Sequence, residues 1–364
     1  MNNGNEEKET KDIKGQKGKG VDIGTVFVKC AYTDSDEVIF KSQRNAFFEV
    51  EYAGFTITKK IFDDRGIKYV IKDDKLYVVG NDTLQFANIF NKETRRPLSN
   101  GVISSTEKEA LPIVELLIKS VVGEPAVKDE IVYFSVPGEP LDADFNIIYH
   151  IKTLEGFLKT LGYTPKPINE ALAVILSELA DKDFTGIGIS FGGGMVNVCL
   201  SFMSVPIFKF SVIRAGDWID QQVAMAVDEA ATRVSAIKEF SLNLSREKEL
   251  GKIENALSIY YNDLIGYVIE HIKQELDKAG GGPAMAKPVT IVLSGGTSLP
   301  KGFAHRFKQI LDHLKFPIPV GEVRMAAQPL SSVAKGALIA ARSEGDNSQT
   351  SASNRANGSI LERR

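Results

Sequence analysis

Three glycine-containing turns, spread over most of the chain, constrain the fold of this sequence more than any other feature. They lie at residues 20–25 (GVDIGT), 185–198 (TGIGISFGGGMVNV) and 291–297 (IVLSGGT). Each adjoins apolar residues typical of β-strands, and glycine there lets backbone N–H groups approach an anion without interference from a Cβ atom. One such stretch would indicate only a tight turn. Three of one style, so far apart, predict one nucleotide held between two lobes.

The composition is that of a large globular protein and excludes several classes of function. The 364 residues, 43% hydrophobic and 25% charged, suffice for two lobes with their own cores. A net charge of −3, without basic clusters among aromatic residues, gives no indication of nucleic-acid binding. The sequence has neither an apolar run of transmembrane length nor a signal peptide, which predicts a cytoplasmic protein without an intrinsic membrane anchor. Cys30 and Cys199 lie in apolar runs and are expected to be buried thiols.

The pattern along the chain predicts two α/β lobes between two disordered tails. Residues 1–19 and 343–364 are polar or charged with little to bury, so both are expected to be disordered, with recruitment of a protein partner as a second possibility. Residues 20–184 form the expected first lobe, which includes a small β-rich subdomain at about 38–90. Residues 185–342 form the expected second lobe. Strands and hairpins precede helices in both, which predicts duplicated α/β halves.

The ordered set of motifs resembles the actin-like ATPase superfamily, and bacterial actins of the MreB and MamK kind most of all. Besides the three turns, residues 168–173 (INEALA) resemble the family's connecting helix. Residues 214–220 (RAGDWID) and 328–336 (QPLSSVAKG) are similar to segments of bacterial actins. The resemblance covers roughly residues 20–342. It implies an α/β fold of two duplicated lobes, with four subdomains in all, and ATP and Mg²⁺ in the cleft between the lobes.

The resemblance also implies roles for particular residues. Asp22 is the candidate metal ligand, directly or through waters, because Mg²⁺ prefers few protein ligands and many waters. The first two turns would hold the phosphates, while the start of the helix at 216 and the third turn would flank ribose and adenine. Asp217 is a candidate ribose partner, and Lys238 falls near the purine-binding helix, where a solvated lysine is an equal alternative. The expected nucleotide-binding residues are Gly24, Thr25, Gly192, Gly193, Gly194, Gly216, Asp217, Lys238, Gly295, Gly296 and Thr297.

Two acidic residues are candidates for orienting the water that attacks the γ-phosphate. Asp144 falls where bacterial actins carry acidic residues, and a carboxylate there would polarise the water. Because helix N-termini favour aspartate in general, a simple helix-start residue is an equal interpretation of Asp144. Glu170, in the segment that resembles the connecting helix, is the second catalytic candidate.

Three departures from the family's pattern predict slow ATP hydrolysis. Ser190 stands where the second phosphate motif begins with aspartate, and Met195 and Val196 replace two threonines. Binding through backbone amides does not depend on these side chains, whereas positioning of metal-bound water does. The sequence therefore predicts a cytoskeletal protein that binds ATP and self-assembles into filaments. The alternative is a nucleotide-gated adaptor of the FtsA or PilM type that polymerises weakly or not at all.

Overall fold

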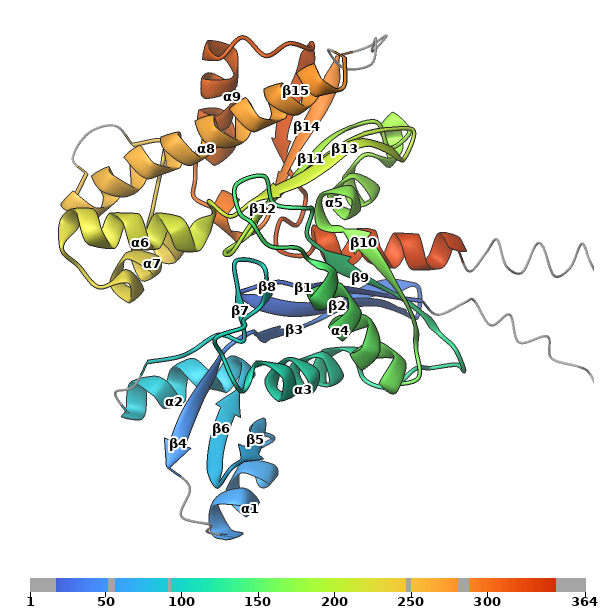
Figure 1. Ribbon diagram of the computed structural model, residues 1–364, viewed down its shortest axis with the longest axis vertical. Coiled ribbons are helices and arrows are strands. Elements are labelled where there is room, and N and C mark those ends of the chain that lie inside the picture. Colours follow the sequence, from blue (N-terminus) through green and yellow to red (C-terminus); the bar gives the residue numbers. More distant parts are fainter. Residues whose placement is uncertain (1–17, 52–55, 91–92, 247–249, 281–287, 345–364) are drawn as a thin grey trace, which may run out of the picture.

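The computed structural model describes residues 18–51, 56–90, 93–246, 250–280 and 288–344 (Figure 1). Most of the two expected tails therefore lies outside the described residues. Their inner ends belong to the fold: Lys19 begins a strand, and Glu344 lies in a helix that spans 332–344. The Glu344 carboxylate accepts a hydrogen bond from Tyr133 Oη at 2.6 Å. Residues 18–19 and 343–344 are therefore part of the fold, and each expected tail is two residues shorter than predicted.

The first lobe is built on a five-stranded sheet with β1 at its centre. The order is β10-β9-β1-β2-β3, and β1 pairs in parallel with β9 and antiparallel with β2. Helices α3 and α4 cover one face, where apolar residues of β1, β2 and β9 are buried. The bounds are β1 Lys19–Ile23, β2 Phe27–Asp34, β3 Glu37–Arg44, β9 Ile131–Val136, β10 Thr164–Asn169, α3 Ala110–Val122 and α4 Ile148–Thr160.

Strand β3 belongs to this sheet, although the sequence predicts residues from 38 onward in the small subdomain. Ser35 and Asp36 have φ angles of 47° and 69°, the left-handed pair of a tight hairpin turn. This turn folds β3 back along the full length of β2. The small subdomain begins only at β4, and its sheet has the order β4-β6-β5. Its elements are β4 Phe47–Glu51, α1 Thr56–Asp64, β5 Tyr69–Lys72, β6 Lys75–Val79 and α2 Thr83–Phe90.

The second lobe repeats the plan of the first. Its sheet has the order β13-β12-β11-β14-β15, and the central strand β11 pairs antiparallel with β12 and in parallel with β14. Each large sheet therefore has a central strand with one parallel and one antiparallel neighbour, and the predicted duplication of α/β halves is confirmed. The bounds are β11 Gly186–Phe191, β12 Val196–Phe202, β13 Val205–Val212, β14 Val289–Ser294 and β15 Val320–Met325.

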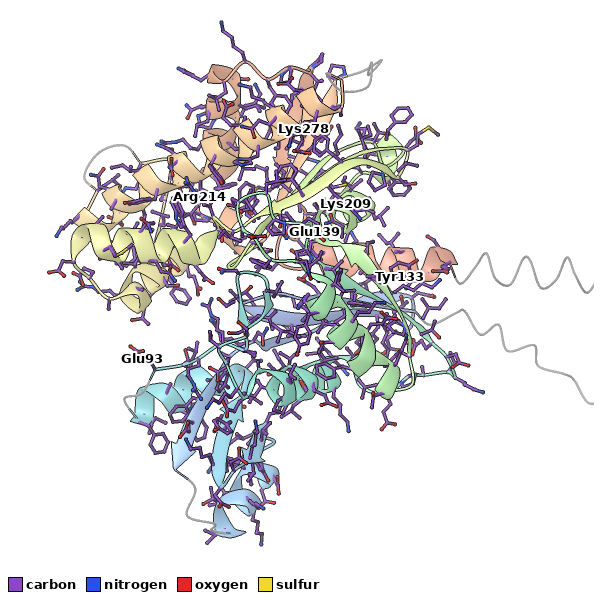
Figure 2. The ribbon with its side chains drawn as sticks, in the orientation of Figure 1. Glu93, Tyr133, Glu139, Lys209, Arg214 and Lys278 are labelled. Carbon is purple, nitrogen blue, oxygen red and sulfur yellow. The ribbon has the colours of Figure 1, made fainter. Side chains whose placement is uncertain are left out.

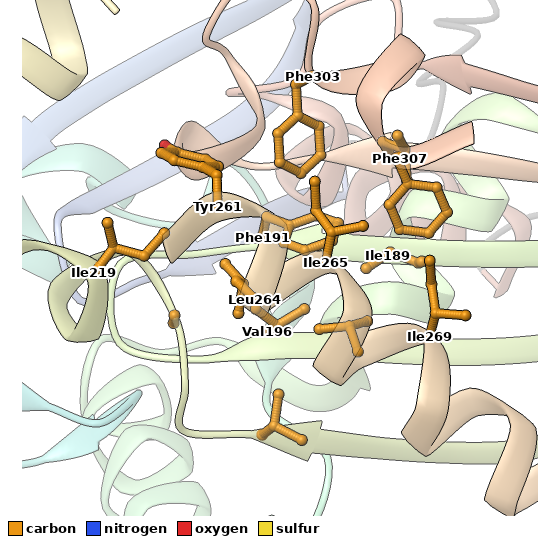
Figure 3. Packing of buried hydrophobic residues seen from close by; sticks show 14 of the residues in the cluster. Ile189, Phe191, Val196, Ile219, Tyr261, Leu264, Ile265, Ile269, Phe303 and Phe307 are labelled. Atoms are coloured by element: carbon orange, nitrogen blue, oxygen red, sulfur yellow. The ribbon is translucent and has the colours of Figure 1, made fainter. Parts of the chain in front are cut away.

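The two faces of β11 are used differently. Ile187, Ile189 and Phe191 point into the large core of the second lobe, which α6, α8 and α9 complete (Figure 3). The Phe191 ring lies 5.0 Å from the Phe303 ring in an edge-to-face contact, which favours one arrangement of the core. The opposite face of the sheet packs on α5. The helices are α5 Glu170–Glu178, α6 Gly216–Val227, α7 Ala231–Phe240, α8 Lys252–Lys278 and α9 Phe303–His313.

The helix at 332–344 returns from the second lobe to the first. Figure 1 shows it beside α5, in the layer between the two large sheets. Ala334 and Leu338 pack on Ala31 of β2 and on Phe40 of β3, so this helix covers the second face of the first sheet. The predicted division at residue 185 therefore separates the two sheets, while the last helix of the expected second lobe crosses back.

Gly336 makes this close packing possible, because a Cβ atom there would overlap the Ala173 carbonyl in α5. We expect Gly336→Ala to lower the free energy of unfolding by about 2 kcal/mol, since overpacking of a tight core is destabilising. Gly156→Ala in α4 is the control, because a Cβ atom there meets no atom within 4 Å. Thermal and denaturant unfolding check both variants. Equal stability of the two would contradict the packing argument.

Among the described helices, none combines the length and apolar character needed to cross a bilayer. Cys30 in β2 and Cys199 in β12 are free and buried, as expected. Burial raises the pKa of each thiol to about 12, so both stay protonated at neutral pH.

Candidate functional site

A cavity of about 310 Å³ lies between the two lobes, where the three predicted glycine turns meet. Asp22, Glu170 and all but one of the expected nucleotide-binding residues line it. The exception is Gly216, which lies directly behind the wall: its N–H donates to the Gly192 carbonyl at 3.1 Å, and its carbonyl accepts from Lys238 Nζ at 2.8 Å. Residues that are far apart in the sequence therefore surround one space.

The second and third turns form a single rigid cradle in the second lobe. Thr297 Oγ1 donates to the Gly192 carbonyl at 2.7 Å, and the Asp217 N–H donates to the Gly193 carbonyl at 2.8 Å. Gly295 has a φ of 91°, and a Cβ atom there would overlap the carbonyl of Phe191. Only glycine lets β14 turn this close to β11.

The first lobe reaches this cradle at Gly194. A Cβ atom on Gly194 would lie 2.5 Å from the Gly101 N atom and would overlap the Thr25 hydroxyl. Gly101 belongs to the turn of a short hairpin, β7 (Leu98–Ser99) and β8 (Val102–Ile103). The lobes are thus in direct backbone contact beside the cavity.

Asp22 is a half-buried acid that lines the cavity. It lies opposite Lys29 in the antiparallel register of β1 and β2. Burial raises the pKa of Asp22, while the Lys29 ammonium and a 3.1 Å hydrogen bond from Ser135 Oγ act in the other direction. Lys29 also donates to the Leu330 carbonyl. Lys29 was not among the predicted site residues, although a lysine inside the apolar run VFVKCAY, opposite Asp22 in a hairpin, is a usable signal.

Of the two catalytic candidates, only Glu170 lines the cavity. It is the first residue of α5, whose N-terminus is capped by Asn169: the Asn169 side chain accepts from Ala171 N and Leu172 N at 3.1 and 3.2 Å. Ser190 Oγ donates to Glu170 Oε2 at 3.3 Å. Burial, and then the nearby Asp22 charge, raise the pKa of Glu170 to about 8. The raised pKa favours the protonated form of this carboxyl group.

Asp144 lies outside the cavity, contrary to the catalytic position expected for it. It is exposed in the loop between β9 and α4, because α4 begins at Ile148. This loop runs along β13 of the second lobe, where the Ser211 N–H donates to the Glu139 carbonyl at 2.9 Å (Figure 2). Asp142 fastens the loop further by accepting from the Ile213 N–H at 2.8 Å. Of the acidic side chains in this loop, that of Asp142 therefore holds it against the second lobe.

Lys238 is buried, so the alternative of a solvated lysine is wrong. Its Nζ donates to Asp220 Oδ2 at 2.7 Å, and both side chains are 8% exposed. Burial raises the pKa of Asp220, against the opposing effect of the Lys238 ammonium. Asp220 is the second acid of the segment RAGDWID and was not among the predicted site residues.

Asp217 is held from across the cavity by Arg96. Arg96 Nη1 lies 2.8 Å from Asp217 Oδ1 and 2.9 Å from Oδ2. A second pair, Arg44 with Glu239, joins β3 to α7 at 3.8 Å. Sequence patterns gave no sign of either pair, because each partner belongs to a different lobe.

The charges around the cavity suit a polyanion that binds together with a metal cation. Four of its acids lie beside a lysine or arginine, and Glu170 lies beside the Ser190 hydroxyl. The described residues contain no group of three potential metal ligands. This donor set fits a Mg²⁺ ion that is held mainly by phosphates and waters, with Asp22 facing the waters. The backbone N–H groups of the turns fit the phosphates.

Solved actin-like proteins share this fold. The MamK double helical filament gives a TM-score of 0.66 at 19% identity, covering 89% of this chain and 98% of that chain. MreB 5 of Spiroplasma citri bound to AMPPNP gives 0.64 at 15% identity, covering 92% and 99%. The ethanolamine utilization protein EutJ from Carboxydothermus hydrogenoformans gives 0.53 at 14% identity, covering 89% and 90%. Identities this low concern the fold alone, and they confirm the expected actin-like ATPase fold.

Among curated proteins, no sequence matches the chain. A family model described as Volactin matches residues 18–341, which include both lobes and the cavity between them. The chain therefore belongs to the Volactin family.

Proposed function

We propose that this protein binds ATP with Mg²⁺ in the cavity and assembles with copies of itself into filaments. The observation that carries the proposal is the convergence of the three glycine turns on one cavity between duplicated lobes. Solved neighbours support it: one is a MamK double helical filament, and structures of MreB 5 hold AMPPNP or ADP.

Different residues of the cavity would bind different groups of the nucleotide. Gly24 and Thr25 from one side and Gly192–Gly194 from the other would hold the phosphates, and Gly295–Thr297 would flank the base. Asp22 would hold waters of the metal, whose charge offsets that of the phosphates. The Lys29 ammonium, which lines the same space, would add a second positive charge. The protein thus positions the phosphates, while most of the positive charge that compensates them comes from the bound metal ion.

Glu170 is the residue best placed to orient an attacking water, because it lines the cavity beside Asp22 and Ser190. Its proton must leave before it can accept one. Ser190 contributes a hydroxyl where an aspartate would contribute charge, and Met195 and Val196 contribute no hydroxyl at all. Slow hydrolysis and long-lived ATP-bound assemblies follow from this set.

A surface suited to self-assembly lies at the tip of the β12–β13 hairpin. Phe202, Met203 and Val205 are 48%, 61% and 66% exposed, and contiguous exposed apolar side chains mark contact sites. The small subdomain, well apart from this tip in Figure 1, carries its own exposed apolar residues. Contact between two different surfaces of successive copies gives an open chain when the rotation between copies does not close a ring. The exposed apolar residues of the small subdomain are Ile57, Ile61, Ile71, Leu84, Ile89 and Phe90.

Charged residues at this tip should prevent assembly. We expect the double variant Phe202→Glu, Val205→Glu to raise the critical concentration at least about tenfold, because each contact would bury unpaired carboxylates. Sedimentation with ATP and Mg²⁺, followed by electron microscopy, measures this. Val127→Glu, which is also at an exposed apolar position, is the control.

Two outcomes of this experiment would contradict the proposal in different ways. A double variant that sediments like the control would exclude the hairpin from the contact. A wild-type protein that binds ATP but stays monomeric at micromolar concentrations would favour the nucleotide-gated adaptor instead.

A further inference from the structure

We propose that Arg96 and Asp217 form a latch across the cavity, which holds the two lobes together and sets how fast the ligand enters and leaves. The proposal rests on the proposed nucleotide function for the identity of the ligand. The latch itself is an interlobe contact that can be tested without any ligand.

The geometry of the pair is that of a close hydrogen-bonded contact between opposite charges. Arg96 lies in the first lobe, between α2 and β7, and Asp217 is the second residue of α6 in the second lobe. A single guanidinium nitrogen reaches both carboxylate oxygens, at 2.8 and 2.9 Å. Hydrogen bonds between charged groups are stronger than neutral ones. The side chains are 32% and 30% exposed, so solvent weakens the pair without removing it.

Asp217 is itself fixed to the part of the cavity that would hold phosphate. Its N–H donates to the Gly193 carbonyl, and its Oδ1 lies 3.4 Å from where a Cβ atom of Gly193 would be. Arg96 therefore fastens the first lobe to the second turn, beside the expected path of the ligand. Both residues line the cavity.

The segment that carries Arg96 forms a strap against the second lobe. The β7–β8 hairpin follows Arg96 directly, and Figure 1 shows it at the end of the first sheet, below the second lobe. A Cβ atom on Gly101, in its turn, would lie 2.6 Å from Met195 Sδ. The Arg44–Glu239 pair crosses between the lobes in the same sense, with the cation on the first lobe and the acid on the second. Opening the cavity must break these contacts together.

The latch also changes the role expected for Asp217. Both of its oxygens are engaged by Arg96, so a ribose hydroxyl has to compete with the guanidinium for this carboxylate. A ligand that enters must first displace Arg96, and a ligand that is already inside is retained while the pair holds. Arg96 thus acts on the kinetics of binding.

The test compares Arg96→Ala with Arg95→Ala. Arg95 is the matched control, because it pairs with Glu49 and Glu107 within the first lobe. A fluorescent ATP analogue is loaded with Mg²⁺ at low ionic strength and chased with excess ATP. We expect release from Arg96→Ala about fivefold faster than from wild type, and from Arg95→Ala at the wild-type rate. Salt should bring the wild-type rate toward that of Arg96→Ala.

A double-mutant cycle separates the latch from a general loss of charge. Release from Arg96→Ala, Asp217→Ala should be no faster than from the faster single variant, since one interaction is removed in both. Additive effects, or an Arg96→Ala rate equal to that of Arg95→Ala, would overturn the proposal.

A ligand-free measurement keeps this test independent of nucleotide binding. Spin labels at Ile148→Cys in α4 and Ile259→Cys in α8, both exposed positions on different lobes, report the distance between lobes, because the two native cysteines are buried. Arg96→Ala should shift that distance distribution to longer values, and an unchanged distribution would overturn the latch. If the wild type binds no nucleotide, the proposed function fails while this measurement still decides the latch.

Discussion

Replacing Gly296 with valine is expected to weaken ATP binding at least about 100-fold, equivalent to roughly 2.7 kcal/mol. Gly296 lines the cavity, and a Cβ atom there would meet only Leu330 Cδ2, at 3.7 Å. The fold therefore tolerates the substitution, while the branched side chain enters the space proposed for the base. Gly295 would be a poorer test, because its φ of 91° makes any side chain there strained.

Titration calorimetry with ATP and Mg²⁺ measures this effect, and thermal unfolding verifies that the variant is folded. Gly266→Val in α8 is the matched control, since a Cβ atom there meets nothing within 4 Å and the residue does not line the cavity. If Gly296→Val binds ATP as tightly as the control, the ligand does not occupy this cavity.

Glu170→Gln should lower the rate of ATP hydrolysis about 100-fold, the loss typical of a missing general base, with little change in ATP affinity. Because the pKa of Glu170 is raised to about 8, its carboxylate fraction grows as pH rises from 6 to 8. The wild-type rate should therefore rise over this range. A metal bound beside Asp22 favours the charged form, which places the midpoint of the profile at or below pH 8.

Phosphate release at saturating ATP and Mg²⁺ measures both the rate and the pH profile. Glu170→Gln should give a low rate without that rise. Asp144→Asn is the control, because Asp144 is exposed outside the cavity and should keep the wild-type rate and profile. A loss in Asp144→Asn without one in Glu170→Gln would reverse the assignment of the two acids.

Local sequence patterns sufficed to predict the duplicated lobes and the three glycine turns that line the cavity. Glycine turns beside apolar strands are local features, so their positions could be read directly from residues 20–25, 185–198 and 291–297. Their convergence on one cavity could be inferred because a single nucleotide between two lobes would account for all three turns. The small subdomain was placed too early, since the turn at 35–36 leaves two possible partners for the strand that follows.

What the sequence could not predict depends on contacts between the lobes. Arg96 and Asp217 are 121 residues apart, and no periodicity connects them. Arg44 looks like an ordinary surface cation at the end of a strand. The position of Asp144 was predicted wrongly because it was inferred from the number of residues after β9. That number does not give the direction of the loop, which runs along β13 of the second lobe. Contacts of this kind follow from the assembled fold.

In the part of the chain that the structure describes, the backbone passes from one lobe to the other at two places. One passage lies at Asn169 and Glu170, where β10 of the first sheet leads into α5. The other lies at about 326–332, where the chain leaves β15 and enters the last helix. Two fixed passages define an axis, so the easiest relative movement of the lobes is a rotation about the line that joins them.

In such a rotation, groups near the axis move little, and groups far from the axis move by larger distances. Glu170 lies at the first passage and Leu330, which accepts from Lys29, lies at the second. Asp22 and Glu170 are therefore expected to keep their relative positions while the cavity opens. Arg96 and Asp217 belong to neither passage, so the same rotation separates them. One small angular change can thus admit or release a ligand without disturbing the groups that would act on it.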